Sequence, residues 1–566
     1  MASMTTLGLK LYGHDSAAAI VLDGKIMAAI SQERLDRKKH SGAFPFEAIF
    51  SCLETTGIRD INDVDEIVIS FNYLKVAFLF DIPSFFSLFP THILETLGGA
   101  IRETRKYFMA WFRLRVKLGY RGRIRSYDHH DCHAAAAYYV SSFDNAAILT
   151  IDARGEYAST CIYAAQEANF SKQYQIKYPN SLGVFYLCIT EYLGFKALED
   201  EGKVMGLAPY GTTKLVNKMR KVLQVSEGTF RFDPKYFEYS VFPFNRLTDY
   251  FLAQFGPARK KEEPINQRHK DVARAAQVVL EDALLELARH AKKETKSRNL
   301  CLSGGVALNS VANSRILRAG IFENIYIYPA AGDDGASVGA ALLAYYRRGN
   351  KRVVDSSNQS PYLGPSSTDR DIMAAVDNKP VNYVLSERVI EDTSKLLAEN
   401  KFVGWYQERA EFGPRALGNR SILASPLIAE NKDLLNARVK FREPFRPFAP
   451  AVLEEAANDY FEMQGVLSPY MILAFPVSKD KIDVIPAVTH IDGTARVQTV
   501  SKHSNLNFWM LIRAFERQTG VPVLLNTSFN VMGQPIVNTP DQAISCLLDT
   551  GLDAVVIGNY IITKRT

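Results

Sequence analysis

Leu7-Gly-Leu-Lys-Leu-Tyr-Gly-His-Asp-Ser-Ala-Ala-Ala-Ile-Val-Leu-Asp-Gly-Lys-Ile-Met-Ala-Ala-Ile30 is the stretch that decides the fold of the first half of the chain. Its apolar runs are separated by the turn formers Gly13-His-Asp-Ser and Asp23-Gly24, so it predicts three strands joined by two tight turns. A second copy follows, in which residues 146–151 precede Asp152-Ala-Arg-Gly and residues 157–164 return as a strand. One strand-turn-strand unit is therefore used twice.

This repeated unit, with acidic and small residues at each first turn, is the pattern of the actin and hexokinase superfamily, where the two turns face each other across a nucleotide cleft. A further strand over 299–302 leads into Ser303-Gly-Gly and a helix whose N-terminus can hold phosphate. Residues 355–368 are rich in turn formers and predict a linker. We therefore predict an α/β protein with an N-terminal domain over 4–354 and an α/β domain over 369–566.

Composition excludes several classes of protein. The 566 residues are 47% hydrophobic and 23% charged, which is typical of a globular protein of two or more domains. A net charge of +6 is weak for a nucleic-acid binder and favours small anionic ligands. The six cysteines form no CxxC pair, so we expect a reducing cytoplasm. The most apolar stretch, 76–97, contains two prolines and two carboxylates, so we predict neither a membrane span nor a membrane partner.

The first chemical constellation is His129-His-Asp-Cys-His133, followed by four alanines that favour a helix. His129 and His133 would share one helical face and could bind one metal ion, although ordinary polar roles are as good an explanation of the spacing alone. Asp152 and Asp333 each follow a strand, and the carboxyl ends of strands line the crevice of an α/β sheet. Nitrogen and oxygen ligands without thiolate suit iron(II), manganese or zinc. For Asp334, a helix-capping role is favoured.

Two further constellations point to phosphate. Lys203 follows a glycine and could reach a phosphate, although a solvated charged loop explains the spacing better. The C-terminal part is dense in arginine, often between apolar or proline residues, and a partly buried cation needs an anionic partner. Because aromatic platforms for bases are not evident, a phosphate-bearing metabolite is preferred to RNA. The basic residues are Arg409, Arg415, Arg420, Lys440, Arg442, Arg446 and Arg496, with the turn Asn526-Thr-Ser-Phe-Asn530 nearby.

Eight motifs follow one another over nearly the whole chain. They are Gly13-His-Asp-Ser-Ala-Ala-Ala, Glu33-Arg-Leu-Asp-Arg-Lys-Lys-His40, His129-His-x-x-His133, Glu201-Gly-Lys-Val-Met-Gly-Leu-Ala-Pro-Tyr-Gly, Leu302-Ser-Gly-Gly-Val-Ala-Leu-Asn, Gly413-Pro-Arg-Ala-Leu-Gly-Asn-Arg-Ser-Ile-Leu, Arg446-Pro-Phe-Ala-Pro and Leu525-Asn-Thr-Ser-Phe-Asn. In this order they resemble the NodU/CmcH carbamoyltransferases. The resemblance implies a duplicated actin-like (ASKHA) N-terminal domain similar to TsaD and a C-terminal domain similar to YrdC. The C-terminal domain would make carbamoyl adenylate from carbamoyl phosphate and ATP with Mg²⁺. The N-terminal domain would pass the carbamoyl group to a hydroxyl of a small natural product and release AMP.

The resemblance also implies roles for individual residues. The metal ligands would be His129, His133, Asp152 and Asp333, holding iron(II) most commonly, with manganese or zinc as alternatives. Gly304, Gly305 and Asn309 would contact the adenylate, with Lys203 near its phosphate. Carbamoyl phosphate and the ATP phosphates would be bound by Arg415, Lys440, Arg446, Arg496, Asn526 and Ser528. The catalytic candidates are His14, as a base beside the nucleotide or as a capping residue, and Lys39 in the cleft loop.

Alternatives remain at this stage. A threonylcarbamoyl-type tRNA modification enzyme shares both folds, and a non-catalytic actin-like module for nucleotides or sugars would share the first. The turn Asp152-Ala-Arg-Gly stands where the family pattern has Asp-Gly-x-Gly, and Arg154 adds a cation near the predicted metal. The acceptor is not readable from the sequence, although overall resemblance leans toward a guanidinium alkaloid of the saxitoxin type. We expect a monomer or a homodimer.

Overall fold

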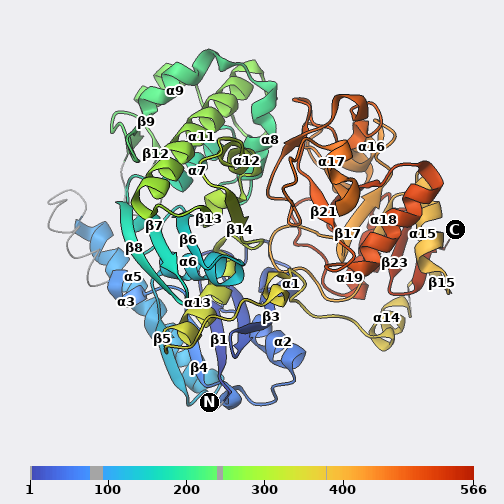
Figure 1. Cartoon of the computed structure of the whole chain (residues 1–566), viewed down its shortest axis with the longest axis horizontal. Helices are drawn as coiled ribbons and strands as arrows, with labels where there is room; N and C mark the ends of the chain where they lie inside the picture. The colour runs from blue at the N-terminus through green and yellow to red at the C-terminus, as the bar shows by residue number, and fades with distance from the viewer. Residues whose placement is uncertain (1–2, 77–92, 239–245, 378, 566) are drawn as a thin grey trace. The chain divides into compact units, whose positions relative to one another are not determined.

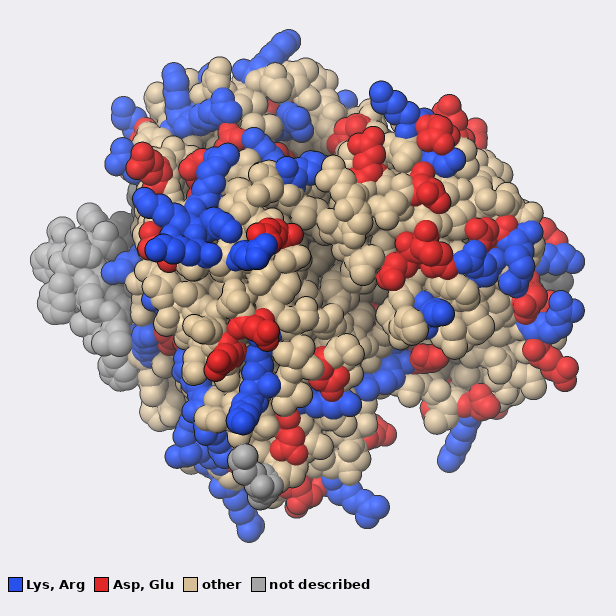
Figure 2. Space-filling view, viewed as in Figure 1, with Lys and Arg blue, Asp and Glu red and all other residues tan. Residues whose placement is uncertain are grey.

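The computed structural model describes residues 3–76, 93–238, 246–377 and 379–565, so most of the apolar stretch at 76–97 lies outside the described residues. The described chain divides into two compact units. Unit 1 comprises Met1–Gln32 and His40–Gln359, and unit 2 comprises Glu33–Lys39 and Ser360–Thr566. Within the described ranges, no helix combines the length and the apolar character needed to cross a bilayer. Basic and acidic side chains are interspersed on the face in Figure 2, in keeping with the net charge of +6.

Unit 1 contains two five-stranded sheets of identical topology (Figure 1). The first has the order β3 (Lys25–Ser31), β2 (Ala17–Leu22), β1 (Thr5–Lys10), β4 (Glu66–Ile69) and β5 (Arg123–Ser126). The second has the order β8 (Asn169–Lys177), β7 (Ala158–Gln166), β6 (Asn145–Ile151), β13 (Asn299–Ser303) and β14 (Asn324–Ile327). In each sheet the first three strands pair antiparallel and the last two pairings are parallel. The predicted duplication is confirmed.

Each sheet is followed by a buried helix, α6 (His129–Val140) after β5 and α13 (Ala336–Tyr346) after β14. Small residues let these elements approach closely. A Cβ at Gly339 would lie 1.8 Å from the Cys132 carbonyl oxygen of α6, and one at Gly8 would lie 1.9 Å from the Ser337 carbonyl oxygen of α13. The alanines after His133 are all fully buried. The two repeats therefore share one tightly packed core between α6, α13 and β1.

The connection between the two parallel strands differs between the repeats. Residues 304–323 join β13 to β14 and contain one α-helix, α12 (Ser310–Arg318). Residues 70–122, more than twice as many, join β4 to β5. Their described part contains α3 (Tyr73–Lys75), α5 (Ile93–Phe112) and the π-helical η3 (Arg113–Lys117). Unit 1 also holds α2 (Phe46–Thr56), α7 (Leu182–Tyr192), α8 (Glu201–Leu207), α9 (Val216–Val222), α10 (Asp249–Phe255) and the long α11 (Gln267–Thr295).

Unit 2 is built on one eight-stranded mixed sheet. Its order is β15 (Val381–Leu385), β24 (Tyr560–Lys564), β23 (Ala554–Ile557), β16 (Val403–Tyr406), β17 (Arg420–Ala424), β22 (Val523–Ser528), β18 (Ala449–Leu453) and β21 (Gln498–Val500). The helices α15 (Val389–Ala398) and α18 (Leu506–Thr519) pack on it through a core that includes Trp405, Phe508 and Phe515. Further α-helices of unit 2 are α1 (Glu33–Asp36), α14 (Asp369–Val376), α16 (Asn431–Leu435), α17 (Ala457–Tyr460) and α19 (Pro540–Asp549). The α/β class predicted for this region is confirmed.

The boundary between the units has two features that composition did not reveal. Glu33–Lys39 belongs to unit 2, where Arg34 donates to the Gly413 carbonyl (2.7 Å) and Arg37 to the Ile536 carbonyl (2.7 Å). The segment predicted as a linker is ordered at both ends. Asn358 accepts from Ile26 N of unit 1 (2.8 Å), and the Tyr362 hydroxyl donates to the Leu417 carbonyl of unit 2 (2.9 Å).

Candidate functional site

The structure brings together the four residues that the sequence predicts as metal ligands, all of them buried. His129 and His133 lie one helical turn apart at the start of α6. Asp152 directly follows β6, and Asp333 lies in η7 (Asp333–Gly335) just before α13. The carboxylate of Glu156 accepts from His129 N (3.1 Å) and so satisfies a buried backbone N–H that has no partner within α6. The helix start, and with it both imidazoles, is therefore held in place.

The separations in this tetrad suit a metal ion. One donor atom from each residue lies within 4.8 Å of the other three. His129 Nε2 lies 3.1 Å from Asp152 Oδ2 and 3.3 Å from Asp333 Oδ1, and His133 Nε2 lies 3.1 Å from Asp152 Oδ2. Ligands bonded at about 2.0–2.2 Å to one ion lie about 3–3.5 Å from each other. The two Nε2 atoms are 3.1 Å apart, a distance that fits an N–H···N hydrogen bond when one ring is protonated there and that also fits two nitrogens bound to one cation.

Outer contacts orient both imidazoles. His129 Nδ1 donates to the Ser70 carbonyl (3.2 Å), and His133 Nδ1 hydrogen-bonds Ser303 Oγ (3.2 Å). Both rings therefore direct Nε2 at the carboxylates, as in histidine metal sites generally. Asp334 does not face this site, because its carboxylate accepts from Ser31 Oγ (3.2 Å) and Gly335 N (2.9 Å).

The tetrad is anionic and attracts positive charge. Lys10 Nζ lies 2.7 Å from Asp333 Oδ2. Burial would raise the pKa of Asp333, but Lys10, His129 and His14 together hold it well below its usual range. Burial would also lower the pKa of His129, yet Asp333 and the bond to Asp152 raise it to about 10. Two carboxylates, two imidazoles and no thiolate form a donor set that fits a divalent ion such as iron(II), manganese or zinc.

His14, predicted as a base beside the nucleotide, lies next to the tetrad. Its Nδ1 is 2.8 Å from Asp15 Oδ2, and its Nε2 is 3.8 Å from Asp333 Oδ2. The other oxygen of Asp15 is 2.7 Å from His40 Nδ1, so Asp15 bridges two histidines. Burial would lower the pKa of His14, but Asp333 and Asp15 raise it to about 9, which does not favour a base at neutral pH. Lys39, the other catalytic candidate, belongs to unit 2, where its charge helps to lower the pKa of Lys440.

The residues predicted to contact the adenylate differ in their surroundings. Gly304 has a φ of +95°, and a Cβ there would lie 2.2 Å from the Ile151 carbonyl oxygen. Gly304 therefore has to be glycine, whereas a Cβ at Gly305 would lie 3.3 Å from Asp152 Oδ1, a tight contact beside the tetrad. Asn309 caps α12 by accepting from Ala312 N (3.0 Å). Lys203 lies on α8, 3.1 Å from Asp200, and not in the solvated loop that the spacing favoured.

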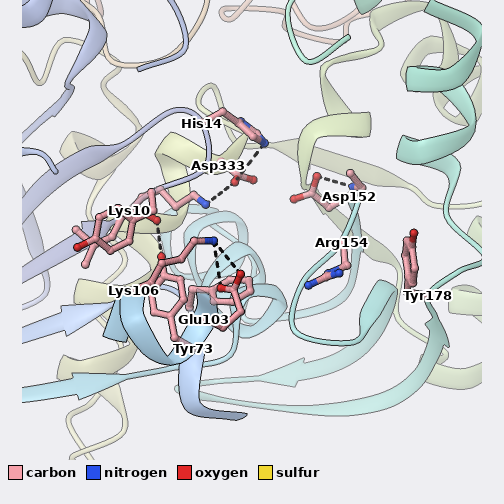
Figure 3. Close-up of a pocket in the computed structure, with 14 residues that line it drawn as sticks. Lys10, His14, Tyr73, Glu103, Lys106, Asp152, Arg154, Tyr178 and Asp333 are labelled. Carbon is pink, nitrogen blue, oxygen red and sulfur yellow. Dashed lines mark hydrogen bonds and ion pairs between the residues drawn. The ribbon is translucent and has the colours of Figure 1, made fainter. Parts of the chain in front are cut away.

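A pocket opens beside the tetrad (Figure 3). Asp152 and Asp333 form part of its wall. Figure 3 shows Arg154 and Tyr178 on one side and Tyr73, Glu103 and Lys106 on the other. The lining residues are Lys10, Leu11, Tyr12, Gly13, His14, Phe71, Tyr73, Glu103, Lys106, Asp152, Ala153, Arg154, Tyr178 and Asp333. Arg154, the departure from the family pattern, therefore faces this pocket, with its guanidinium carbon 5.7 Å from the centre of the Tyr178 ring.

Unit 2 contains an arginine cluster, defined here as Arg415, Arg442, Arg446 and Arg496, all half-buried. Burial, and then the charges of Arg415, Arg442 and Arg446, lower the pKa of Arg496 well below its usual range. Burial and Arg446 lower the pKa of Arg415 to about 10. Glu443 lies 3.8 Å from Arg446, and no ion pair is found for the other three within the described part of unit 2. Such a concentration of like charge needs an anionic ligand.

The remaining predicted phosphate residues lie deeper in unit 2. Lys440 is 2% exposed, and its ammonium donates to Ser528 O (2.7 Å), Asn530 O (2.8 Å) and Asn530 Oδ1 (2.6 Å). An ammonium has three hydrogens, so these acceptors leave none for a phosphate. Lys440 therefore anchors the turn that carries Ser528. The Asn526 amide donates to Gln498 Oε1 (2.8 Å).

Two arginines of the predicted basic set are structural. Arg420 is fully buried, stacks on the Tyr406 ring at 3.5 Å and donates to the Asn419 carbonyl (2.9 Å). Arg409 donates to the Gly364 carbonyl (2.9 Å). The density of arginine suggested that both residues bind a ligand. Their guanidinium groups instead donate to backbone carbonyls, which can also satisfy a buried guanidinium.

Three important residues were missed by the sequence analysis. Lys10 is a charged residue within an otherwise apolar strand, and this break in the apolar run was a sequence signal that could have identified it. Arg442 was noted among the basic residues but not selected for phosphate, although it lies four residues before Arg446 in the same Pro-rich segment. Glu156 follows the second turn, and nothing in its spacing indicates that it caps a helix 27 residues earlier.

Known protein families match the N-terminal and the C-terminal parts of the chain separately. The profile described as Carbamoyltransferase N-terminus matches residues 5–342, and the profile described as Carbamoyltransferase C-terminus matches residues 394–564. The uncharacterized protein sll1178 of Synechocystis is 39% identical, with 99% of this chain and 96% of that protein aligned. Nodulation protein NolNO of Sinorhizobium fredii is 38% identical over 98% of this chain and 79% of its own length. Nodulation protein U of the same species is 30% identical over 96% of both chains. The chain therefore belongs to the carbamoyltransferase family of the NodU type, as its motifs predict.

Proposed function

We propose that this carbamoyltransferase uses carbamoyl phosphate and ATP to carbamoylate a hydroxyl group of a small molecule, through a carbamoyl adenylate. The observation that carries the proposal is the arginine cluster of unit 2. Four guanidinium groups converge with too few carboxylates, which is the arrangement that phosphate groups bind best. Arg415, Arg446 and Arg496 would bind carbamoyl phosphate and the ATP phosphates. Arg442 donates to Asn436 Oδ1 (2.7 Å) and to the Pro447 carbonyl (3.2 Å), so it would add positive charge beside them. Mg²⁺ would accompany ATP.

The chemistry balances with one water molecule. Water cleaves carbamoyl phosphate to carbamate and phosphate. A carbamate oxygen then attacks the α-phosphorus of ATP, which forms the carbamoyl adenylate and releases pyrophosphate. The acceptor oxygen attacks the carbamoyl carbon, the bond to the phosphate oxygen of AMP breaks, and the hydroxyl proton leaves. Joining the carbamoyl group to AMP supplies a good leaving group to an otherwise poor electrophile.

Unit 1 would carry out the transfer step. His129, His133, Asp152 and Asp333 would hold the divalent ion, with iron(II) preferred and manganese or zinc as alternatives; when bound, it acts as a Lewis acid on an oxygen that gains charge. Lys10 holds Asp333 at 2.7 Å, and Glu156 holds the start of α6. The Gly304-Gly305 turn would let the adenylate approach Asp152, because a side chain at Gly305 would fill that space. His14 would hydrogen-bond the acceptor or the adenylate.

The acceptor is proposed to be a small natural product. Basic and acidic residues number 67 and 61, which supports a small ligand over tRNA. All six cysteines are buried and outside disulfides, which supports the predicted cytoplasmic location. A saxitoxin-type alkaloid, the acceptor toward which overall resemblance leans, is a guanidinium cation, and the charges of the pocket wall discussed below disfavour it.

Pyrophosphate exchange tests the proposal. The purified chain is expected to exchange labelled pyrophosphate into ATP only when carbamoyl phosphate is present. Arg496→Met is expected to lower the exchange rate by at least about tenfold, because a charged hydrogen bond contributes about 1.5–3 kcal/mol. Arg370→Met, an exposed arginine on α14 of the same unit, serves as the matched control.

Each alternative has its own outcome in this assay. Exchange that needs threonine and bicarbonate instead of carbamoyl phosphate would favour the tRNA-modifying alternative. Nucleotide binding without any exchange would favour the non-catalytic module. Either result would contradict the proposal.

A further inference from the structure

The long connection between β4 and β5 brings side chains to the tetrad that the second repeat does not supply. Tyr73 comes from α3, and Glu103 and Lys106 come from one face of α5. All three line the pocket beside Asp333 (Figure 3). The matching connection between β13 and β14 is less than half as long and contributes no residue to the pocket lining. This part of the pocket is therefore an addition to the duplicated core.

Glu103 and Lys106 form a charged pair in the pocket wall. Lys106 Nζ lies 2.9 Å and 3.2 Å from the two Glu103 oxygens. The Glu103 side chain is 3% exposed and that of Lys106 is 29% exposed. Burial lowers the pKa of Lys106, and Glu103 opposes that change. Arg102 Nε also lies 3.3 Å from Glu103 Oε1, so two partly exposed cations hold this buried carboxylate at the pocket wall.

The rest of this wall is aromatic. The Tyr73 hydroxyl donates to the Leu11 carbonyl (2.5 Å), and the Lys106 ammonium lies 5.8 Å from the centre of the Tyr73 ring. Phe71 and Tyr178 also line the pocket. Aromatic faces beside an adjacent donor and acceptor suit a ring that carries neighbouring hydroxyl groups, since one hydroxyl can donate to the carboxylate while the next accepts from the ammonium.

The charges of the wall indicate which acceptors it disfavours. Lys10, His14, Lys106 and Arg154 supply positive charge, and Glu103, Asp152 and Asp333 supply negative charge. Lys10 lies 2.7 Å from Asp333, and His14 lies 2.8 Å from Asp15. Glu103 already faces Lys106. A cationic acceptor would therefore meet Lys106 and Arg154, while Glu103 is already paired with Lys106 and Asp333 with Lys10, which disfavours its binding.

We propose that Glu103 and Lys106 bind two neighbouring hydroxyl groups of the acceptor and select a neutral or acidic polyhydroxylated ring over a cationic one. This inference rests on the proposed function, since it assigns the acceptor side of the transfer step. The residues expected at the adenylate, Gly304 and Gly305, come from the other repeat and are not in the pocket lining. The two substrates thus reach Asp152 along different surfaces of unit 1.

Binding of simple sugars tests this assignment without turnover. The full-length protein is titrated by saturation-transfer NMR with methyl glucoside, its 2-amino analogue and methyl glucuronide. The amino sugar is expected to bind at least about tenfold more weakly than the neutral one, because like charges repel at this wall. Glu103→Gln and Lys106→Met are each expected to weaken methyl glucoside binding about tenfold. Glu54→Gln, an exposed carboxylate on α2, is the matched control.

The carbamoyl phosphate-dependent exchange reaction and the melting temperature are measured on the same variants. The inference is supported when both stay near the wild-type values while sugar binding falls. It is overturned when the amino sugar binds best, when no sugar binds, or when neither variant changes the binding. Loss of exchange in the wild-type protein would instead contradict the proposed function, so the two failures are distinguishable.

Discussion

Phosphate should stabilise unit 2 through the arginine cluster, and Arg496→Met should remove most of that effect. Burial and the three neighbouring arginines lower the pKa of Arg496, which means that its positive charge is unfavourable until an anion binds. Arg496 Nε has no hydrogen-bond partner within the described ranges. A ligand at a hundred times its Kd stabilises the folded state by about 2.7 kcal/mol. In a domain of this size, that corresponds to a rise in Tm of about 5–10 °C.

Arg496→Met should be stabilised less by phosphate than the wild type, but it should be at least as stable as the wild type without phosphate. Loss of one charged hydrogen bond weakens phosphate binding by about ten- to a hundredfold. At the same phosphate concentration, the stabilisation then falls to about 0.4–1.4 kcal/mol, or about 1–5 °C. Without phosphate, Arg496→Met is expected to be at least as stable as the wild type, because a repelled, half-buried cation has been removed.

Tryptophan fluorescence is a suitable probe for this measurement. Trp405 is fully buried in the core of unit 2, and Trp509 lies on α18 of the same unit. Melting curves in phosphate and in chloride of equal ionic strength separate specific binding from screening. Arg370→Met is the control. The explanation is refuted if Arg496→Met keeps the full phosphate shift, or if chloride gives the same rise in the wild type.

Three other perturbations have defined outcomes. Asp152→Asn removes a tetrad ligand and is expected to weaken iron(II) or zinc binding at least about a hundredfold in a chelator competition. Asp334→Asn changes a carboxylate outside the tetrad and should retain binding. Equal affinities of the two variants would contradict the ligand assignment. Lys440→Met leaves the acceptors at Ser528 and Asn530 unsatisfied and should lower the free energy of unfolding by about 2–3 kcal/mol in urea titrations. A smaller loss, together with no rise in Tm on adding phosphate, would instead make Lys440 a ligand-binding residue. His490 provides a pH test: burial lowers its pKa to about 4 in the folded state from 6.5 when unfolded, so the unfolded state binds more protons between these values. Stability should therefore fall by up to about 3 kcal/mol as the pH drops from 6.5 to 4, and His490→Asn should flatten this dependence; an unchanged pH profile would count against it.

Much of unit 1 was predictable because its information is local. The strand pattern around Gly13-His-Asp-Ser and its second copy predicted the duplication, which the two identical sheet topologies confirm. The spacing of His129 and His133 predicted a shared helical face, and both residues lie at the start of α6. Asp152 and Asp333 were predictable because strand ends in such sheets converge.

Other features depend on contacts between distant segments. The Glu33–Lys39 segment joins unit 2 through bonds to residues near 413 and 536, which no local pattern encodes. Lys440 was expected at phosphate, but its partners at 528 and 530 are visible only after the chain has folded. Arg409 and Arg420 show that arginine density alone does not separate ligand-binding guanidinium groups from those that hold backbone carbonyls.

The two repeats supply different kinds of donor atom to the tetrad. The first repeat, β1 to α6, supplies both nitrogen donors, and the second, β6 to α13, supplies both oxygen donors. An ion bound there would crosslink the two repeats. Any rotation of one repeat against the other would move the histidines away from the aspartates. Affinity for the ion would then depend on the angle between the two halves.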